Sequence, residues 1–315
     1  MNRPYWALVL NYGRRRDTVR CAESLLASSE PPERLVICDN GSPDDSLEAL
    51  ARWAGEDPGR GGLLRLSRTQ AEAGALSGDE RIVLIDTGAN LGYAGGNNVG
   101  LRLALASGAP YVWLLNSDTT VFPDAASALL DHMAAHEGCG LCGALTRYMD
   151  DPEVVQCFGG GWFAPLWGRG GLHGDGARLP LGAEPQDPPG RLDYVNGASV
   201  FIRREFLLHV GLMEEAYFLY CEELDWAARA ARSPGRWELC WSPRAQVLHA
   251  EGLSTGVSNR RGRGRGLGQA LILLRSRLLY TWKFHPFCLP TALAGQAWAL
   301  ARKLSRRVVG GGRAG

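Results

Sequence analysis

Asp118 is the first residue of this chain whose type and position could do chemistry. It follows an apolar run at residues 111–115 and the polar pair Asn116 and Ser117. Such a run predicts a strand buried on both faces, with polar side chains at its carboxyl end, where open α/β sheets bind ligands. A carboxylate there suits a hard divalent cation, which takes oxygen ligands and usually keeps substrate phosphates in its shell. The alternative is that Asn116 and Asp118 cap the next helix or shape a turn.

A second acidic group, Glu222, Glu223 and Asp225, follows an aromatic-rich stretch at residues 217–220. A predicted helix through residues 227–232 comes next, so these carboxylates stand in its first turn. Acids in that position commonly cap a helix or interact with its dipole. A carboxylate aimed into a partly dry, substrate-filled pocket can instead act as a general base. Both interpretations fit these residues by themselves.

Two earlier strand ends carry further polar side chains. Residues 6–11 form an apolar run that ends at Asn11, residues 17–28 have helical spacing, and the apolar run 35–38 is followed by Asp39. Alternating strands and helices with short loops predict a parallel sheet covered by helices, in which Asn11 and Asp39 lie side by side. Asp39 could accept hydrogen bonds from a ribose or a base edge. Turn chemistry with no ligand is the alternative.

A glycine-rich stretch at residues 90–100 follows the apolar run 82–85 and precedes a helix that reaches Ala106. Its glycines would let the backbone approach a ligand closely, and the helix N-terminus would favour a pyrophosphate. The spacing is neither the GxGxxG dinucleotide fingerprint nor a Walker loop. The stretch therefore argues against a dehydrogenase and against a P-loop protein.

Composition narrows the class of protein. The 315 residues suffice for one large domain or two modest ones. A balance of 34 Lys and Arg against 33 Asp and Glu leaves a formal charge of +1, so no global field attracts nucleic acid. We expect no signal peptide and no membrane span, because the N-terminus has only a short apolar strand and no apolar run reaches about 18 residues.

The eight cysteines lie mostly within apolar runs, which predicts reduced thiols in a cytoplasmic protein. Cys139 and Cys142 have the spacing of one half of a zinc site, but no second pair follows them. We therefore expect both to be core residues.

Taken in order, three of these stretches resemble the signature of family 2 glycosyltransferases, in particular of the bacterial rhamnosyltransferase and galactofuranosyltransferase-like branch. They are Asp-Asn-Gly-Ser at 39–42, the glycine-rich stretch at 90–98, and Leu-Asn-Ser-Asp-Thr at 115–119. The resemblance implies an α/β GT-A fold with a Rossmann-like, mostly parallel sheet flanked by helices, and a nucleotide-diphosphate sugar donor. It also implies a Mn²⁺ or Mg²⁺ ion that bridges the diphosphate to Asp118, in a DxD-type motif whose usual first Asp is here Asn116.

The resemblance further implies roles for individual residues. In the family the second acid of an acidic pair is the base of an inverting sugar transfer; here that residue is Glu223, with Glu222 and Asp225 supporting it. Glu stands where Asp is commoner, so the base lies one methylene further from its backbone. His249, at a predicted strand end, would join Asp118 in the metal shell, although a lone His is usually an ordinary surface residue. The donor-binding residues carried over are Asn11, Asp39, Asn40, Asn90, Gly92, Gly95, Gly96, Asn97 and Asn116.

Two segments between the motifs have less regular sequences. Residues 54–80 predict a surface excursion with one short strand or helix. Residues 157–189 predict a long loop, and loops of that length often act as lids or binding loops. Trp162 and Trp167 in this loop either stack on a sugar or pack back on the surface. The strand expected at residues 193–202 would adjoin the acceptor site.

The chain is expected to divide into a GT-A domain at 1–256, a flexible basic loop at 257–268, and a C-terminal amphipathic helical region with a disordered tail at 269–315. Within the first part, residues 237–241 and 245–248 predict two short strands. The basic loop is either a lid that neutralises phosphates or a solvated linker. The C-terminal region is apolar on one face and basic on another, which suits an anionic membrane surface, the catalytic domain or a homodimer partner.

The sequence therefore predicts a cytoplasmic, metal-dependent, inverting glycosyltransferase, from a resemblance that covers about residues 4–285. Its donor would be dTDP-rhamnose or a UDP-sugar, and its acceptor a glycan or lipid-linked glycan in cell-surface polysaccharide assembly. We expect no nucleic-acid partner, while peripheral contact with the inner face of the cell membrane and a homo-oligomer stay open. The alternatives are a non-catalytic nucleotide-sugar or carbohydrate-binding relative, and a sugar-phosphate nucleotidyltransferase, which would release pyrophosphate.

Overall fold

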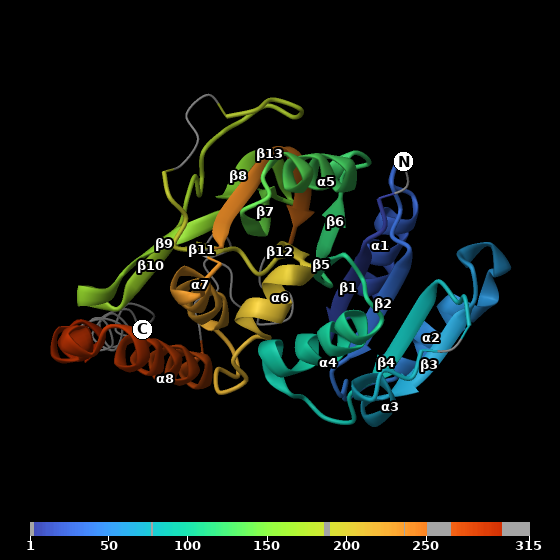
Figure 1. Ribbon diagram of the computed structural model, residues 1–315, viewed down its shortest axis with the longest axis horizontal. Helices are drawn as coiled ribbons and strands as arrows, with labels where there is room; N and C mark the ends of the chain where they lie inside the picture. The colour runs from blue at the N-terminus through green and yellow to red at the C-terminus, as the bar shows by residue number, and fades with distance from the viewer. Residues whose placement is uncertain (1–2, 77, 186–189, 236, 251–265, 298–315) are drawn as a thin grey trace, which may run out of the picture.

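The computed structural model describes residues 3–76, 78–185, 190–235, 237–250 and 266–297, and Figure 1 shows a central twisted sheet with helices on both of its faces. Of the predicted basic loop at 257–268, residues 257–265 lie outside the described residues. The tail from residue 298 lies outside them as well.

The N-terminal half alternates strands and helices, as predicted. Its elements are β1 (Trp6–Asn11), α1 (Arg15–Leu26), β2 (Arg34–Asp39), α2 (Ser46–Glu56), the 3₁₀ turn η1 (Pro58–Arg60), β3 (Leu63–Ser67), α3 (Arg68–Glu72), β4 (Ile82–Asp86), α4 (Gly92–Ala106) and β5 (Tyr111–Asn116). These strands pair in parallel in the order β3-β4-β2-β1-β5, so their carboxyl ends meet at one edge. Residues 54–80 were expected to form a surface excursion with one short strand or helix; they hold both a strand and a helix, β3 and α3, and β3 extends the main sheet.

The C-terminal half adds antiparallel strands to the same sheet. Its elements are β6 (Thr119–Val121), α5 (Ala125–Ala135), β7 (Cys139–Tyr148), β8 (Asp151–Phe158), β12 (Ser199–Arg203), α6 (Arg204–Val210), α7 (Glu222–Arg232) and β13 (Glu238–His249). β12 lies antiparallel between β5 and β7, and β13 runs parallel to β7 and antiparallel to β6. The prediction of two strands at 237–241 and 245–248 was wrong. One strand runs through both, because an irregularity between Ser242 and Gln246 accommodates Pro243 without ending the pairing.

The described residues also form a small antiparallel sheet beside the large one. It contains β9 (Gly160–Ala164), β10 (Arg169–Leu172) and β11 (Tyr194–Val195) in the order β10-β9-β11, with the 3₁₀ turn η2 (Pro165–Trp167) between β9 and β10. The prediction of one long loop at 157–189 was therefore wrong. The strands were missed because their glycines interrupt the apolar pattern that predicts a strand. Glycine is needed at position 160, since a side chain there would collide with the Tyr194 backbone.

Alternate residues of each strand enter two different cores. Ala7 and Val9 of β1 pack in the core that contains α1, α2 and α5, whereas Trp6 and Leu8 pack in the core that contains α3, α4, α6 and α7. Burial on both faces explains why the strands are continuous apolar runs in the sequence. Cys139 and Cys142, which are close in sequence, are fully buried, as predicted. All eight cysteines are free thiols.

A C-terminal helical extension, as expected, is formed by α8 (Leu267–Phe284) and the 3₁₀ turn η3 (Pro286–Cys288). α8 lies against the segment that precedes α7. The Ser276 hydroxyl donates to the carbonyl of Leu219 at 2.9 Å, and Arg275 Nη1 donates to the carbonyl of Ala216 at 2.9 Å. In Figure 1 α8 lies next to α7, on the side of the molecule away from β3 and β4. Among the described helices, none is long and apolar enough to cross a membrane.

Candidate active site

A buried polar cluster joins the carboxyl ends of β1 and β2. Asp39 accepts hydrogen bonds from Asn11 Nδ2 at 2.7 Å, from the Ser42 hydroxyl at 2.7 Å and from the Ser42 backbone amide at 2.9 Å. Asn11 Oδ1 accepts from the Thr18 hydroxyl at 2.7 Å. The parallel register that sets Asn11 opposite Asp39 makes this cluster, as the sequence predicted.

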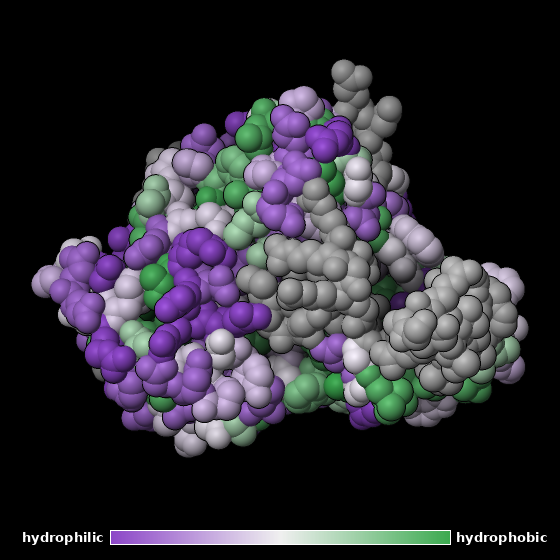
Figure 2. Space-filling model, turned by 180° about the vertical axis from the view of Figure 1, so that it is seen from behind, coloured by the Kyte–Doolittle hydropathy of each residue, from purple (hydrophilic) through white to green (hydrophobic). Residues whose placement is uncertain are grey.

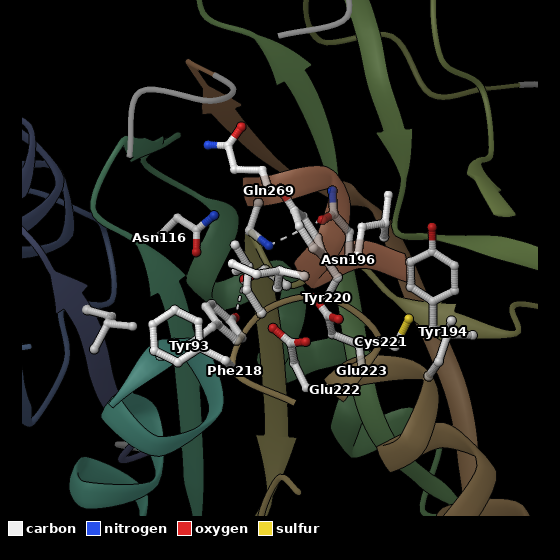
Figure 3. Close-up of a pocket in the computed structure, with 18 of the residues that line it drawn as sticks. Tyr93, Asn116, Tyr194, Asn196, Phe218, Tyr220, Cys221, Glu222, Glu223 and Gln269 are labelled. Carbon is white, nitrogen blue, oxygen red and sulfur yellow. Dashed lines mark hydrogen bonds between the residues drawn. The ribbon is translucent and has the colours of Figure 1, made fainter. Parts of the chain in front are cut away.

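A cavity of about 640 Å³ adjoins this cluster, and small-molecule sites commonly measure about 300–1,000 Å³. Eight predicted site residues line it: Asn40, Asn90, Gly92, Asn116, Asp118, Glu222, Glu223 and His249. Figure 3 shows Asn116 on one side of the cavity and the carboxylates of Glu222 and Glu223 on the other, with Gln269 of α8 and Asn196 nearby. The structure thus brings together both acidic groups of the sequence.

Six predicted site residues do not line the cavity: Asn11, Asp39, Gly95, Gly96, Asn97 and Asp225. Asn11 and Asp39 form the cluster beside it. Gly95, Gly96 and Asn97 lie inside α4. A side chain at Gly96 would come within 2.6 Å of Leu10 and 2.9 Å of the Asn40 amide. Asn97 Nδ2 donates to the Tyr93 carbonyl one turn earlier, at 3.0 Å. These positions let α4 pack closely against the sheet. A glycine-rich sequence serves close packing and phosphate binding equally well, so the sequence alone could not distinguish the two roles.

Asp118 and His249 meet at the end of the sheet. The pairing of β13 with β6 sets His249 opposite Thr119, and Asp118 Oδ1 then lies 3.1 Å from His249 Nε2. The other ring nitrogen, Nδ1, lies 2.7 Å from Gln156 Oε1. When Nδ1 donates its proton to Gln156, Nε2 presents a lone pair beside a carboxylate oxygen. Two electron-pair donors at this distance fit a shared cation, and imidazole with carboxylate is a normal set for Mn²⁺.

Asn116, at the position of the first Asp of the family motif, lies beside the His249 imidazole. Its Nδ2 atom lies 3.4 Å from His249 Nε2. An amide nitrogen donates hydrogen bonds and does not bind a cation, so this orientation favours a contact with the imidazole or with the ligand.

Glu222 and Glu223 begin α7 directly after a strained turn. Tyr220 and Cys221 have φ angles of 72° and 71°, a conformation that costs a residue other than glycine about 1–3 kcal/mol. Packing against α8 holds the turn, since the Ser276 hydroxyl bonds the carbonyl just before it. The strained turn directs the first residues of α7 toward the cavity (Figure 3).

The backbone at Gly197 holds the Glu223 carboxylate. Its amide donates a hydrogen bond to Glu223, and the Tyr93 hydroxyl donates to the Gly197 carbonyl at 2.7 Å. A side chain at position 197 would collide with Glu223 Oε1. Burial raises the pKa of Glu223 to about 7. Burial and the adjacent charge of Glu223 raise the pKa of Glu222 well above its usual range. A base with a pKa near 7 matches proton removal at neutral pH.

Asp225 has a structural position. It is fully buried and accepts hydrogen bonds from Lys283 Nζ at 2.6 Å, Arg229 Nε at 2.6 Å and the Tyr217 hydroxyl at 3.1 Å. These contacts tie α7 to α8 and to the preceding segment. Asp225 therefore anchors α7, the helix that carries Glu223.

Sequence reasoning missed several lining residues, among them Tyr93, Tyr194, Phe218, Gln269 and Arg277. Tyr93 lies within the glycine-rich motif, and Arg277 lies on the basic face of the C-terminal region, so both patterns contained a signal. Neither pattern shows that α8 reaches the cavity. Trp162 and Trp167, considered above for sugar stacking, do not line it and are 42% and 60% exposed.

Comparison with known proteins finds similarity to glycosyltransferases. Residues 7–156 match the family model described as Glycosyl transferase family 2. The N-acetylglucosaminyl-diphospho-decaprenol L-rhamnosyltransferase of Mycobacterium tuberculosis is 27% identical over 254 residues, which cover 75% of this chain and 73% of that protein.

Solved structures share the fold. The mannosyltransferase PcManGT from Pyrobaculum calidifontis, in complex with GDP-Man and Mn²⁺, has a TM-score of 0.55 at 15% identity, over 98% of this chain and 79% of that one. GalNAc-T7 with UDP, GalNAc and Mn²⁺ has a TM-score of 0.58 at 14% identity, over 88% and 47% of the two chains. S. aureus TarS in complex with UDP has a TM-score of 0.52 at 12% identity, over 92% and 70%. At such identities the likeness is one of fold.

Proposed function

We propose that this chain, a family 2 glycosyltransferase of the rhamnosyltransferase branch with the GT-A fold, transfers a sugar with inversion from a nucleoside diphosphate to a lipid-linked glycan. The observation that carries the proposal is that Glu223 and the Asp118–His249 pair line one cavity. The name of the mycobacterial relative, which specifies rhamnosyl transfer to a sugar on diphospho-decaprenol, supports the class of acceptor. dTDP-rhamnose is the donor we favour, ahead of a UDP-sugar.

The donor is proposed to bind at the carboxyl ends of β1, β2 and β5. Asn40, whose Nδ2 donates to Asn90 Oδ1 at 3.2 Å, and Asn116 line this part of the cavity. Asp118 and His249 would hold Mn²⁺ or Mg²⁺, and the Mn²⁺ bound in two solved relatives of the fold supports a divalent ion. When bound, this ion supplies positive charge that stabilises the leaving diphosphate.

The acceptor is proposed to bind against α7. Glu223 would take the proton of the acceptor hydroxyl. The hydroxyl oxygen of the acceptor would attack the anomeric carbon of the donor sugar while the nucleoside diphosphate leaves from the opposite face. Attack opposite the leaving group inverts the configuration. Burial and the neighbouring carboxylate favour the protonated form of Glu222, which leaves the negative charge of the pair on Glu223. Tyr194 and Phe218 form aromatic walls against which a sugar can stack.

A lipid-linked acceptor requires contact with a membrane surface. The described C-terminal region exposes five large apolar side chains: Leu267, Leu271, Trp282, Phe287 and Leu293. In the rear view of Figure 2, hydrophobic residues gather at the lower right, the side on which Figure 1 places α8 after the half turn. We therefore place the enzyme peripherally at the inner face of the cell membrane, with α8 directed toward the lipid.

Nucleoside diphosphates test the donor site directly. We would measure the melting temperature with UDP, dTDP, GDP and CDP, each with and without Mn²⁺. Saturation at a hundred times the dissociation constant stabilises by about 2.7 kcal/mol, a rise of roughly 5 °C for a chain of this size. A metal-dependent shift for one diphosphate supports the proposal and names the donor's base; the absence of any shift would contradict it.

The products distinguish the remaining alternatives. With a donor sugar and a sugar-diphospholipid acceptor, we expect free nucleoside diphosphate in step with a lengthened glycolipid. Release of pyrophosphate from a nucleoside triphosphate would instead identify a nucleotidyltransferase. Donor binding without turnover on any sugar-diphospholipid would identify a binding protein.

A further inference from the structure

Three metal-binding side chains meet at the end of the sheet remote from the catalytic cavity. His132 projects from α5, Cys139 is the first residue of β7, and Cys240 lies near the start of β13. One ligand atom from each lies within 4.8 Å of both others. Cys240 pairs with Cys142 and His249 with Tyr148, six residues further along β7, so the two are about 20 Å apart at the usual rise of about 3.3 Å per residue. The cluster is therefore distinct from the Asp118–His249 pair.

The strand register creates this cluster. Glu238 pairs with Cys139, but Leu239 pairs with Leu141, so one residue of β7 is passed over. This irregularity sets Cys139 and Cys240 in the same core, beneath α5. The Ser242 hydroxyl donates to the Ala128 carbonyl of α5, which ties the helix to β13.

The imidazole of the cluster is held in place by a neighbouring ring. The His136 ring stacks on the His132 ring with centroids 4.2 Å apart, and His136 Nδ1 lies 2.9 Å from the His132 carbonyl. Cys240 is a hydrogen-bonding partner of both Cys139 and His132. Because Cys240 and His132 are only partly buried, a metal ion can enter from solvent without unfolding of the core.

We propose that His132, Cys139 and Cys240 bind one Zn²⁺ ion, with water as the fourth ligand, and that this ion clamps α5 to β7 and β13. Two thiolates and an imidazole form a soft ligand set that selects zinc over Mg²⁺ and Mn²⁺. Ligand atoms held about 2.0–2.3 Å from zinc lie about 3.3–3.8 Å apart, so small side-chain rotations close the observed cluster on an ion. The spacing of Cys139 and Cys142 did not lead to this site, because the thiol beside Cys139 and His132 is Cys240 of β13.

Zinc binds cysteine as the thiolate, whereas a free cysteine thiol, with a pKa of about 8.5, keeps its proton at neutral pH. Zinc binding must therefore release protons, which makes proton release on titration with zinc a second readout of the same site.

Metal content tests the site in the full-length protein. After dialysis against metal-free buffer, addition of zinc and gel filtration, we expect about one additional zinc per chain in the wild type and near none in Cys240→Ser or His132→Gln. Addition of zinc should also raise the wild-type melting temperature by about 5 °C at saturation. Cys288→Ser is the matched control, because Cys288 is a free, partly buried thiol outside the cluster.

Cobalt separates this site from the catalytic one. Co²⁺ bound by thiolates has a sulfur-to-metal charge-transfer absorption that an oxygen and nitrogen site lacks. We expect this absorption in the wild type and in Asp118→Ala, and its loss in Cys240→Ser. Zinc content that is equal in Cys240→Ser and the wild type, or cobalt binding without the thiolate absorption, would overturn the proposal. A circular dichroism spectrum unchanged in Cys240→Ser shows that the loss of metal is not a loss of folding.

Discussion

Burial gives the Glu223 side chain its chemistry. A carboxylate in water is almost fully ionised at neutral pH and holds protons weakly. In the cavity, loss of hydration raises the pKa of Glu223 to about 7, while the Gly197 amide directs the carboxylate. The group is then half ionised near pH 7 and is a stronger base than an exposed acid. At the scale of the residue, the environment decides which of three neighbouring acids can act.

Replacing Glu223 with Gln should lower kcat by about 10²–10⁴-fold, the usual contribution of a general base. Donor binding should be unchanged, because Gln has the same size. In the wild type the rate should fall as the pH falls below about 7, and this dependence should vanish in the variant. Steady-state kinetics from acid to alkaline pH measure both effects. The exposed Glu205, in the first turn of α6, provides the control variant Glu205→Gln; unchanged turnover in Glu223→Gln would exclude Glu223 as the base.

The same pKa shift predicts a pH-dependent stability. The folded state retains a proton that the unfolded chain releases near the ordinary value of 4.5. The associated stability is complete below that pH and is lost as the pH rises through about 7. Glu223→Gln cannot ionise, so its free energy of unfolding should exceed that of the wild type at pH 8 by up to about 3 kcal/mol, and by much less at pH 5. Denaturant titrations at the two pH values measure the difference, and an equal difference at both would contradict the prediction.

Gln156 is predicted to orient the His249 imidazole, which we propose as a metal ligand. Its Oε1 atom lies 2.7 Å from His249 Nδ1 and directs Nε2 toward Asp118. Gln156→Leu should weaken Mn²⁺-dependent binding of the nucleoside diphosphate by about 10–100-fold, the usual effect of losing such a partner. Gln156→Glu keeps an oxygen acceptor and should restore most of the affinity. Isothermal titration of the metal and the diphosphate measures it, and equal affinity in Gln156→Leu would disprove the role.

At the scale of the element, contacts with α8 fix the position of α7, the helix that carries Glu223. Asp225 accepts a hydrogen bond from Arg229 of α7 on one carboxylate oxygen and from Lys283 of α8 on the other. The strained turn before α7 is also held by α8, through Ser276 and the carbonyl of Leu219. The cost of the turn is thus offset by contacts outside it.

Asp225→Ala should destabilise the protein by about 2–3 kcal/mol, because Arg229 and Lys283 lose their shared carboxylate in a partly buried setting. Thermal unfolding measures the loss. Glu48→Ala breaks an exposed pair with Arg65 and should leave the melting temperature almost unchanged. Equal melting temperatures for Asp225→Ala and the wild type would show that α8 does not depend on this contact.

At the scale of the whole molecule, the catalytic cavity lies where the two halves of the sheet meet. In the proposed mechanism the strands of the first half and His249 of β13 supply the donor side, and α7 and α8 supply the acceptor side. The family match ends at residue 156, so Glu223 and His249 both lie beyond it. α8 lines the cavity with one face and exposes apolar side chains on another, so the apolar outer surface lies next to the cavity.

The double substitution Trp282→Ser and Phe287→Ser should lower binding to anionic lipid vesicles at least about tenfold, because each ring buries apolar area in the interface. Trp282 is 63% and Phe287 is 97% exposed, so folding should not change. Vesicle co-sedimentation measures the binding. Leu208→Ser, on α6, is the control, and equal loss in it would mean that α8 does not face the membrane.

The sequence alone determined most strands of the N-terminal half, their parallel direction and the polar residues at their ends. Those features depend on local patterns: each buried strand is a continuous apolar run, and short connections leave few ways to join strands. The same local logic predicted Asn11 beside Asp39. It failed for β9 and β10, where the lack of a side chain is required by close neighbours: Gly160 lies against the Tyr194 backbone and Gly170 against the Trp162 backbone.

Only the tertiary structure decided which predicted residues face the cavity. Glu223 and Asp225 lie two positions apart in one helical turn, and the packing of α8 directs one to the cavity and buries the other against Lys283. Gln156 reaches His249 across the sheet, and Cys240 reaches Cys139 through an irregular register. Contacts of this kind join residues distant in sequence, and their geometry comes from the packing of whole elements, which no local pattern specifies.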